Sequence, residues 1–492
     1  MNSEDKKNLI INIFLTALYG LFTLVTVLHH EIWSDEAQVW QIVQNVSFVG
    51  LFKHLVNEGH PSFFYLLIMP FAKIFHYAGS IMIMQIICWA FMSASVFLLL
   101  QFSSFSKLSK FAIVTSAGFL YFLPVNARSY AILPFFVFLA AFLYPKVKEK
   151  PILYSIILAI IANTHVIMFG FCAALFALFV FENREKKYIP SYCIMAFGLL
   201  AVVLQLIGTF SSNEFISYGQ YDFLSSTLSV FSKFFINGYD DMYQKTHQFL
   251  FPPTAITAIL TIAVLFFANF VALFKINKKM FFIASLSVAF QFFVYIYSYN
   301  VYVYVTRIYC AYIILIFCWW IALNSSNLKE KTIKISNICI SIFFILTMFN
   351  GLKYTLLDLQ YNFSSSKQTA EFINENIDKD ALIIENFDPV FVSILPYLKD
   401  RTLYSASTNK DFHYIKWGNE LKQMKSDYGL LEYIQKLKTN KKIYLVISSF
   451  KNLNSPSESF PNEFTQVFES SPSIAEGQSF KIYEYTGITT KN

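Results

Sequence analysis

Residues 8–28 read NLIINIFLTALYGLFTLVTVL, a stretch that contains no charged side chain. A helix that crosses the hydrocarbon core of a bilayer needs about 20 mainly apolar residues. The stretch therefore predicts a transmembrane helix. It is followed directly by HHEIWSDEA, residues 29–37, where charged side chains and a Trp return. A Trp at the end of an apolar run is typical of a membrane–water interface.

Further apolar runs follow along the chain and bring the expected number of transmembrane helices to about 11. The N-terminal run lacks a small-residue cleavage site, which favours a retained helix over a cleaved signal peptide. Two of the runs, 152–163 and 166–181, are short and are compatible with two tilted helices joined at Asn163-Thr164-His165. The other runs cover residues 81–102, 111–125, 131–144, 190–209, 252–274, 280–299, 307–324 and 335–355.

The composition places most of the chain in lipid. Of 492 residues, 56% are hydrophobic and 14% are charged, and the mean hydropathy is +0.49. Soluble globular chains carry about 25% charged residues. The net charge of +7 does not indicate nucleic acid as a partner, because the Lys and Arg residues lie in short clusters between apolar runs. The six cysteines all fall within apolar runs, which does not favour a disulfide framework.

The distribution of Lys and Arg sets the expected orientation. With the N-terminus in the cytoplasm, 16 basic residues lie in cytoplasmic segments and six in the opposite short loops. This positive-inside bias predicts a cytoplasmic N-terminus and an extracytoplasmic C-terminus. The six outer residues are Lys53, Lys73, Arg128, Lys233, Lys245 and Arg307.

Three regions are then expected outside the membrane: the loops 29–80 and 210–251, and the tail from residue 356. Within the first loop, residues 36–46 and 63–70 predict helices at the membrane surface, the second ending at Pro70. The tail predicts a small α/β domain over 356–492, separate from a transmembrane domain over 1–355. Its expected helices are 367–377 and 390–398, and its expected strands are 381–384, 442–447 and 479–485.

A few polar residues at membrane boundaries are candidates for chemistry. Asp35 and Glu36 follow the first apolar run, where the alternatives are a solvated pair of loop acids and an active site. Arg128 and Arg307 lie at the outer ends of apolar runs, where a guanidinium pairs well with a carboxylate or phosphate. A contact with lipid headgroups, or a structural ion pair with Asp35 or Glu36, is the alternative for Arg128.

All eight histidines fall outside the membrane in this topology, and His60 and His165 are the best candidates among them because each lies where a loop meets a helix. No HxxH or HExxH spacing indicates a fixed zinc site. Glycine-rich nucleotide loops are also absent from the sequence, so nucleotide use has no support.

The order of three motifs resembles the GT-C superfamily of membrane glycosyltransferases. These are Trp33-Ser34-Asp35-Glu36-Ala37, Gly59-His60-Pro61-Ser62-Phe63-Phe64-Tyr65-Leu66-Leu67 and Arg128-Ser129-Tyr130. They look like those of the branch of protein O-mannosyltransferases and aminoarabinose transferases, which includes glycosyltransferase family 39. Ser62 stands where that branch usually has a second Pro. His165, Arg307 and an extracytoplasmic α/β domain also fit this layout.

The resemblance implies an inverting sugar transfer from a polyprenyl-phosphate donor to a glycan, lipid A or another lipid, or a protein, at the outer face of a bacterial inner membrane. By resemblance, Asp35 would be the general base, and Glu36 would orient the acceptor. Arg128 and Arg307 would bind the donor phosphate, and His60, Tyr130 and His165 would bind substrate. The resemblance leaves open whether Asp35 and Glu36 share a divalent metal ion as a cofactor.

Three other functional classes remain open at this stage. A transporter or flippase for lipid-linked sugars would also place arginines near a membrane cavity. A polysaccharide ligase or polymerase would share the lipid-linked donor. A non-catalytic scaffold in envelope glycan assembly is a further alternative. All of these proteins would contact membrane lipids.

Overall fold

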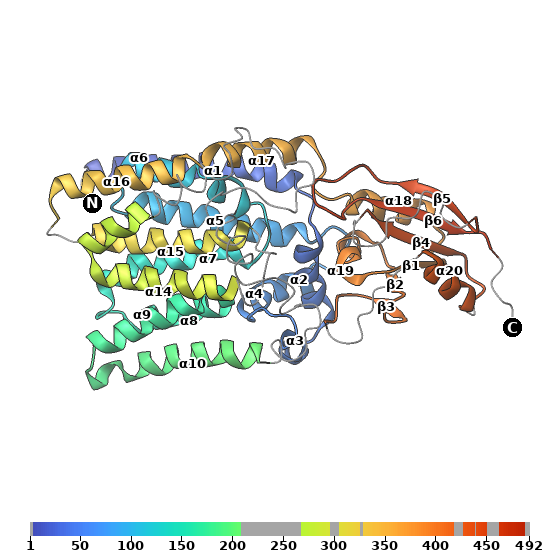
Figure 1. Ribbon diagram of the computed structural model, residues 1–492, viewed down its shortest axis with the longest axis horizontal. Coiled ribbons are helices and arrows are strands. Elements are labelled where there is room, and N and C mark those ends of the chain that lie inside the picture. The colour runs from blue at the N-terminus through green and yellow to red at the C-terminus, as the bar shows by residue number, and fades with distance from the viewer. Residues whose placement is uncertain are drawn as a thin grey trace.

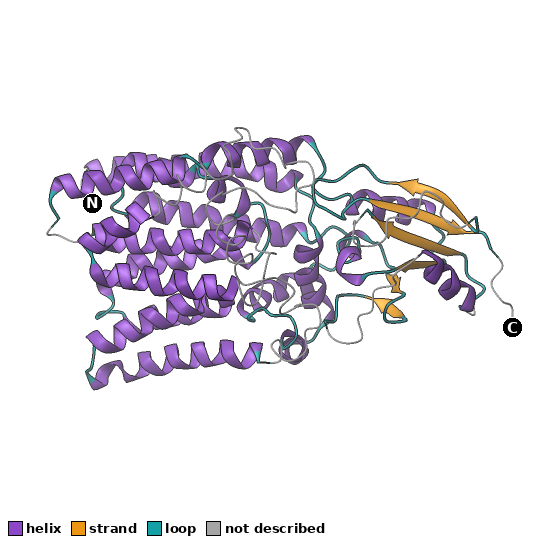
Figure 2. Ribbon diagram, viewed as in Figure 1, coloured by secondary structure: helices purple, strands orange, loops and turns teal. Residues whose placement is uncertain are grey.

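The computed structural model describes residues 3–207, 267–295, 305–324, 328–417, 427–437, 439–449 and 462–487. It shows a bundle of helices with a small mixed sheet at one end (Figures 1 and 2). Helix α1 (Ser3–His29) begins at the end of the bundle away from the sheet (Figure 1). The expected fold class, a membrane helix bundle with a small C-terminal α/β domain, is confirmed.

Five helical segments of the described chain are long and apolar enough to cross a membrane. They are Ser3–His29, Met82–Phe102, Ser129–Lys146, Lys186–Leu206 and Glu330–Gln360. Shorter apolar helices pack among them, as predicted for the pair on either side of His165. These are α8 (Pro151–Thr164), α9 (Phe169–Glu182), α14 (Lys278–Val294), α15 (Val305–Leu323) and the helix Phe267–Ile276. The chain is therefore a multi-pass membrane protein.

Most predicted spans coincide with helices of the bundle. These are α1 (Ser3–His29), α5 (Met82–Phe102), α7 (Ser129–Leu143), α8, α9, α10 (Ile189–Leu206), α14 and α15. The run 252–274 is described only from residue 267 and the run 280–299 only as far as Tyr295, because residues 208–266 and 296–304 lie outside the described residues. The predicted outer loop 210–251 also lies there.

Two predicted spans are interrupted in the structure. The run 111–125 contains the end of α6 (Lys107–Val114) and a π-helix over Gly118–Phe122. The run 335–355 is divided between α16 (Glu330–Ile345) and α17 (Met348–Gln360). The two breaks lie against each other, because the Thr347 hydroxyl accepts a hydrogen bond of 3.1 Å from the backbone N–H of Ala117. A Cβ atom on Gly351 would lie 2.8 Å from the Cα atom of Ala117, so only glycine allows this close approach.

The first loop folds into three short helices at the end of the bundle nearest the sheet (Figure 1). The helix predicted over 36–46 is confirmed as α2 (Ser34–Asn45), and α3 (Phe48–Leu55) was not expected. The helix predicted to end at Pro70 continues as α4 (Phe63–Ile74), so that boundary was wrong. Proline removes one backbone hydrogen bond and does not always end a helix.

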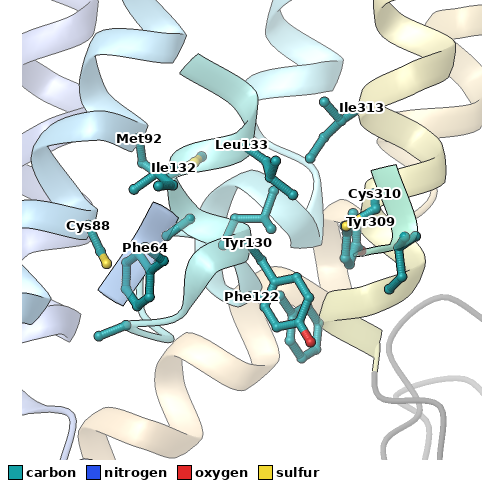
Figure 3. Packing of buried hydrophobic residues seen from close by; sticks show 14 of the residues in the cluster. Phe64, Cys88, Met92, Phe122, Tyr130, Ile132, Leu133, Tyr309, Cys310 and Ile313 are labelled. Atoms are coloured by element: carbon teal, nitrogen blue, oxygen red, sulfur yellow. The ribbon is translucent and has the colours of Figure 1, made fainter. Parts of the chain in front are cut away.

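The bundle core consists of closely packed aromatic and aliphatic side chains. Figure 3 shows part of it, with Phe64 from α4, Tyr130 and Leu133 from α7, and Tyr309 from α15. Buried aromatic rings contribute large apolar areas and pack edge to face. One example is the pair Phe63 and Phe136, whose ring centroids are 5.6 Å apart. This packing fixes the ends of α4 and α7, which carry several of the candidate residues.

The tail forms a six-stranded sheet in the order β3-β2-β1-β4-β6-β5. The central strand β1 (Leu382–Glu385) is parallel to β2 (Leu403–Ser405) and β4 (Ile443–Ser448). The outer strands β3 (Lys410–Phe412), β6 (Phe480–Tyr485) and β5 (Phe464–Glu469) pair antiparallel. Helices α18 (Ser366–Asn376) and α20 (Asp427–Lys436) accompany the sheet.

The predicted strands 381–384, 442–447 and 479–485 and the predicted helix 367–377 are confirmed as β1, β4, β6 and α18. The predicted helix 390–398 is wrong in extent, because the structure has only the short α19 (Asp388–Phe391) and a 3-10 turn over Leu395–Tyr397. Pro396 lies inside this region and lacks the backbone N–H that a continuous helix would use there, which weakens a regular helix at this point. The division between the two domains at residue 355 stays a prediction.

Candidate active site

Asp35 lies in the first turn of α2, at the end of the bundle nearest the sheet. A negative side chain in the first turn stabilises a helix through the helix dipole. The Asp35 side chain is 39% exposed, and its Oδ2 atom lies 3.6 Å from Nη2 of Arg128. Nη1 of Arg128 also donates to the backbone carbonyl of Asp35. The carboxylate is therefore held by one guanidinium and remains open to an incoming group.

Arg128 connects Asp35 to His60. Its guanidinium is buried, and its Nη2 atom lies 3.1 Å from Nε2 of His60. Because a guanidinium can only donate, His60 must accept at Nε2 and carry its proton at Nδ1 when it is neutral. Burial, followed by the charges of Arg128, His165 and Arg307, holds the pKa of His60 well below its usual range. His60 is therefore neutral at pH 7.

The buried Nδ1 atom of His60 has no hydrogen-bond partner among the described residues. A buried donor without a partner costs free energy unless a ligand or water completes it. His60 and Arg128 line a narrow crevice at this end of the bundle, together with Val39, Pro61, Phe64, Tyr65, Ser129 and Thr164. The crevice therefore presents a neutral donor beside a buried positive charge.

Tyr130 joins His165 and Arg307. Its hydroxyl oxygen lies 3.1 Å from Nε of Arg307 and 3.2 Å from Nε2 of His165. Nδ1 of His165 accepts a hydrogen bond from the backbone N–H of Ile167 at 3.2 Å, so the neutral ring carries its proton at Nε2. The Tyr130 oxygen thus accepts from both side chains, and its own O–H proton remains available to a third group. Burial and the two arginine charges hold the pKa of His165 well below its usual range.

The structure brings the two groups of side chains together, although they come from distant parts of the sequence. The rings of His60 and His165 have centroids 5.4 Å apart, and those of Tyr130 and His165 have centroids 4.8 Å apart. Both arginines are buried, with 7% exposure each. Arg128, Arg307 and Asp35 together carry a net positive charge next to neutral histidines. Such an arrangement favours an anion.

Tyr65 belongs to this site and was not predicted from the sequence. It lies on α4, is 2% exposed and lines the crevice with His60 and Arg128. Its hydroxyl is buried without a hydrogen-bond partner among the described residues. The sequence signal for it was its place in the motif Gly59–Leu67, five residues after His60 and in the first turn of α4.

Glu36 is placed differently from Asp35. Its side chain is wholly buried, and its Oε1 atom accepts a hydrogen bond of 2.6 Å from the backbone N–H of Ala127. Its Oε2 atom accepts from the backbone N–H of Trp33 at 3.1 Å. Both carboxylate oxygens therefore accept hydrogen bonds from backbone N–H groups. One of these bonds fixes Ala127, the residue that directly precedes Arg128.

The sequence left open a divalent metal ion shared by Asp35 and Glu36. Within the described part of the chain, no three or more His, Cys, Asp and Glu side chains come together as a group that could hold a metal ion. The carboxylates of Asp35 and Glu36 were the suggested ligands, and Glu36 has both oxygens engaged with backbone N–H groups. The residues present therefore do not fit a metal shared by these two carboxylates.

Comparison with solved structures shows a structural likeness over almost the whole chain. The chain is similar to ArnT from Cupriavidus metallidurans. The crystal structure of that protein bound to undecaprenyl phosphate shares 10% sequence identity with this chain, with a TM-score of 0.47. The likeness covers 96% of this chain and 97% of that one. No family model matches the sequence, and no curated protein matches it. Neither the identity nor the TM-score is high enough to assign a function.

Proposed function

We propose that this chain is an inverting glycosyltransferase that moves a sugar from a polyprenyl-phosphate donor to an acceptor hydroxyl. The reaction would take place at the outer face of the cytoplasmic membrane of a bacterium. One observation carries the proposal. A half-exposed carboxylate, Asp35, lies beside a buried cationic crevice with polar atoms that have no hydrogen-bond partner in the part of the chain that the structure describes. The positive charge of Arg128 in the crevice suits a phosphate, and the carboxylate of Asp35 suits an acceptor hydroxyl.

Asp35 acts as the general base in this proposal. It accepts the proton from the acceptor hydroxyl as the hydroxyl oxygen attacks the anomeric carbon. The bond between that carbon and the phosphate oxygen breaks, and the polyprenyl phosphate leaves with the bonding electrons. A single direct displacement inverts the configuration at the anomeric carbon. Asp35 is suited to the role because Arg128 holds it from one side while 39% of its side chain stays exposed.

The leaving phosphate gains negative charge during the reaction and needs fixed positive groups. Arg128 and Arg307 are our candidates for these groups. The O–H of Tyr130 and the Nδ1–H of His60 are our candidates for neutral donors to the same phosphate. All four groups are held in place by protein contacts before any ligand binds, so little reorganisation is needed.

The surroundings of the site suit a lipid-linked donor. Helix α4, which begins just after His60, carries apolar side chains on its outer face, with Phe71 38% exposed and Ile74 72% exposed. A helix of this kind lies well against lipid tails. A polyprenyl chain in the bilayer would therefore reach the crevice along α4, while the acceptor would approach from the side of the sheet.

A transfer assay with a polyprenyl-phosphate sugar tests the proposal. We expect Asp35→Asn and Asp35→Ala to lower kcat by about 100-fold to 10,000-fold, the usual contribution of a general base. Both variants should fold, because the side chain is half exposed. Glu58→Gln is a matched control, since this carboxylate lies on the same loop and contacts His54. Wild-type rates for both Asp35 variants would refute the role of Asp35 as base.

The same preparations separate the proposed enzyme from the other classes. A flippase would move the lipid-linked sugar between leaflets of a vesicle without any transfer product. A ligase or polymerase would transfer a preassembled glycan and not a single sugar. The acceptor class, whether glycan, lipid A or protein, follows from the product that is lost when the gene is deleted.

The proposed sidedness has its own test. A cysteine introduced at Asn57 or Lys410 should react with a membrane-impermeant thiol reagent added to intact cells. A cysteine at Lys148, in a loop between α7 and α8, should react only after lysis. The opposite labelling pattern would place Asp35 in the cytoplasm and would refute the outer-face reaction.

A further inference from the structure

His30 lies directly after α1 in a fully buried position that the proposed reaction does not use. Its Nδ1 atom lies 2.6 Å from Oδ2 of Asp358 on α17, and its Nε2 atom lies 3.5 Å from Oε2 of Glu36 on α2. All three side chains are fully buried. The ring also packs against Phe363, with ring centroids 4.3 Å apart. His30 therefore lies between two carboxylates that belong to different parts of the chain.

Two buried carboxylates on either side of one imidazole need a positive charge between them. An uncompensated buried charge is strongly unfavourable. Burial alone would lower the pKa of His30, but the nearby carboxylates of Asp358 and Glu36 outweigh it and raise the pKa to about 10. A doubly protonated ring can donate from both nitrogens, one toward each carboxylate. The hydroxyl of Tyr121 donates a second hydrogen bond, of 2.8 Å, to the same Oδ2 atom of Asp358. The other oxygen, Oδ1, is buried without a hydrogen-bond partner among the described residues.

Glu36 connects His30 to the candidate active site through hydrogen bonds with the backbone. Its carboxylate accepts from the backbone N–H groups of Trp33 and Ala127, at 3.1 and 2.6 Å. Trp33 precedes the helical turn that carries Asp35, and Ala127 directly precedes Arg128. Two consecutive residues of α2 therefore bind two consecutive residues of the other segment: Glu36 holds Ala127, and Asp35 contacts Arg128. Movement of the Glu36 carboxylate would change the separation of Asp35 and Arg128.

We propose that His30 is a positioning residue that bridges Asp358 and Glu36 and thereby sets the placement of Asp35 against Arg128. The two contacts of His30 hold α17, the helix before the C-terminal domain, against the first turn of α2. It acts through Glu36 and does not touch substrate. The inference rests on the proposed function for its effect on catalysis, but the bridge itself is a property of the folded chain.

The first experiment is a charge-compensation test in the transfer assay with the full chain in lipid nanodiscs. His30→Gln leaves two buried carboxylates without a cation, and we expect kcat to fall roughly 100-fold, as for a small misplacement of reacting groups. The KM for the donor should change less than 3-fold. In the double variant His30→Gln/Asp358→Asn, one carboxylate is removed together with the cation, and kcat should recover to within about 10-fold of wild type. His29→Gln, at the exposed neighbouring position, is the control.

The second experiment does not depend on the reaction. Nitrogen-15 NMR of histidine-labelled protein should show one ring protonated at both nitrogens at pH 8, and this signal should disappear in His30→Gln. A neutral His30 ring at pH 8 would overturn the inference, as would a double variant no better than His30→Gln. If even wild type transfers no sugar but the charged ring is observed and the double variant is more heat-stable than His30→Gln, the proposed function fails and the bridge stands.

Discussion

Gln38 on α2 and Ile415 in the C-terminal domain bind each other through two hydrogen bonds of 2.9 Å. The backbone N–H of Ile415 donates to Oε1 of Gln38, and Nε2 of Gln38 donates to the carbonyl of Ile415. Near the start of the same helix, Nε2 of Gln478 donates to the hydroxyl of Ser34 at 2.9 Å. The C-terminal domain thus holds the helix that carries Asp35 at two points, although it supplies none of the charged groups of the candidate site.

The contact between Gln38 and Ile415 gives a first prediction. Gln38→Leu should leave a buried N–H and a buried carbonyl of Ile415 without partners, which costs about 1–3 kcal/mol for each such group. Hydrogen exchange at residues 413–417 should become faster, and transfer should slow. Gln44→Leu, on the same helix but only partly buried, should leave both unchanged. Equal exchange rates in wild type and Gln38→Leu would show that this contact does not hold the domain.

Arg128 should not tolerate replacement by lysine. A lysine keeps the charge but loses the planar fork that reaches Asp35 and His60 together. We expect kcat/KM for the lipid-linked donor to fall about 10-fold to 100-fold, because hydrogen bonds to charged groups contribute about 1.5–3 kcal/mol. Arg184→Lys, at an exposed position, is the matched control. Full activity of Arg128→Lys would mean that only its charge matters.

The hydroxyl of Tyr130 provides a test of the predicted phosphate site. Tyr130→Phe removes the oxygen that accepts from Arg307 and His165, together with a donor to the phosphate. Donor affinity, measured by titration with polyprenyl phosphate, should fall about 10-fold or more. Tyr154→Phe also removes a buried hydroxyl, but one without a hydrogen-bond partner among the described residues, and should bind normally. If the two variants bind equally well, the Tyr130 hydroxyl does not contact the phosphate.

The buried carboxyl group of Glu385 should make the stability of the C-terminal domain depend on pH. Burial, and then the neighbouring Asp388, raise the pKa of Glu385 well above its usual value of 4.5. The folded state therefore keeps a proton that the unfolded state loses, so the contribution to stability is complete below pH 4.5 and is lost as pH rises above it. Glu385→Gln should raise the melting temperature at pH 8, and this gain should shrink toward pH 4.5. A gain that does not depend on pH would contradict the protonated state.

Asp35 and Glu36 have different surroundings in the structure, and the local sequence does not predict this difference. The two acids are adjacent, and consecutive residues on a helix point about 100° apart. One side chain is therefore half exposed beside Arg128, and the other is fully buried against Ala127. The sequence predicted both as candidates, since both follow the first apolar run. Only the direction in which α2 packs against the bundle distinguishes them.

The sequence by itself determined the membrane character, most of the spans, the presence of helix α2 and three strands of the C-terminal domain. These features follow from local apolar runs and periodicity, which depend on neighbours in the chain. Tertiary structure alone decided the contacts of the site. Tyr130 meets Arg307 across 177 positions and His30 meets Asp358 across 328. Such pairs depend on how whole helices pack, and no local pattern encodes that packing.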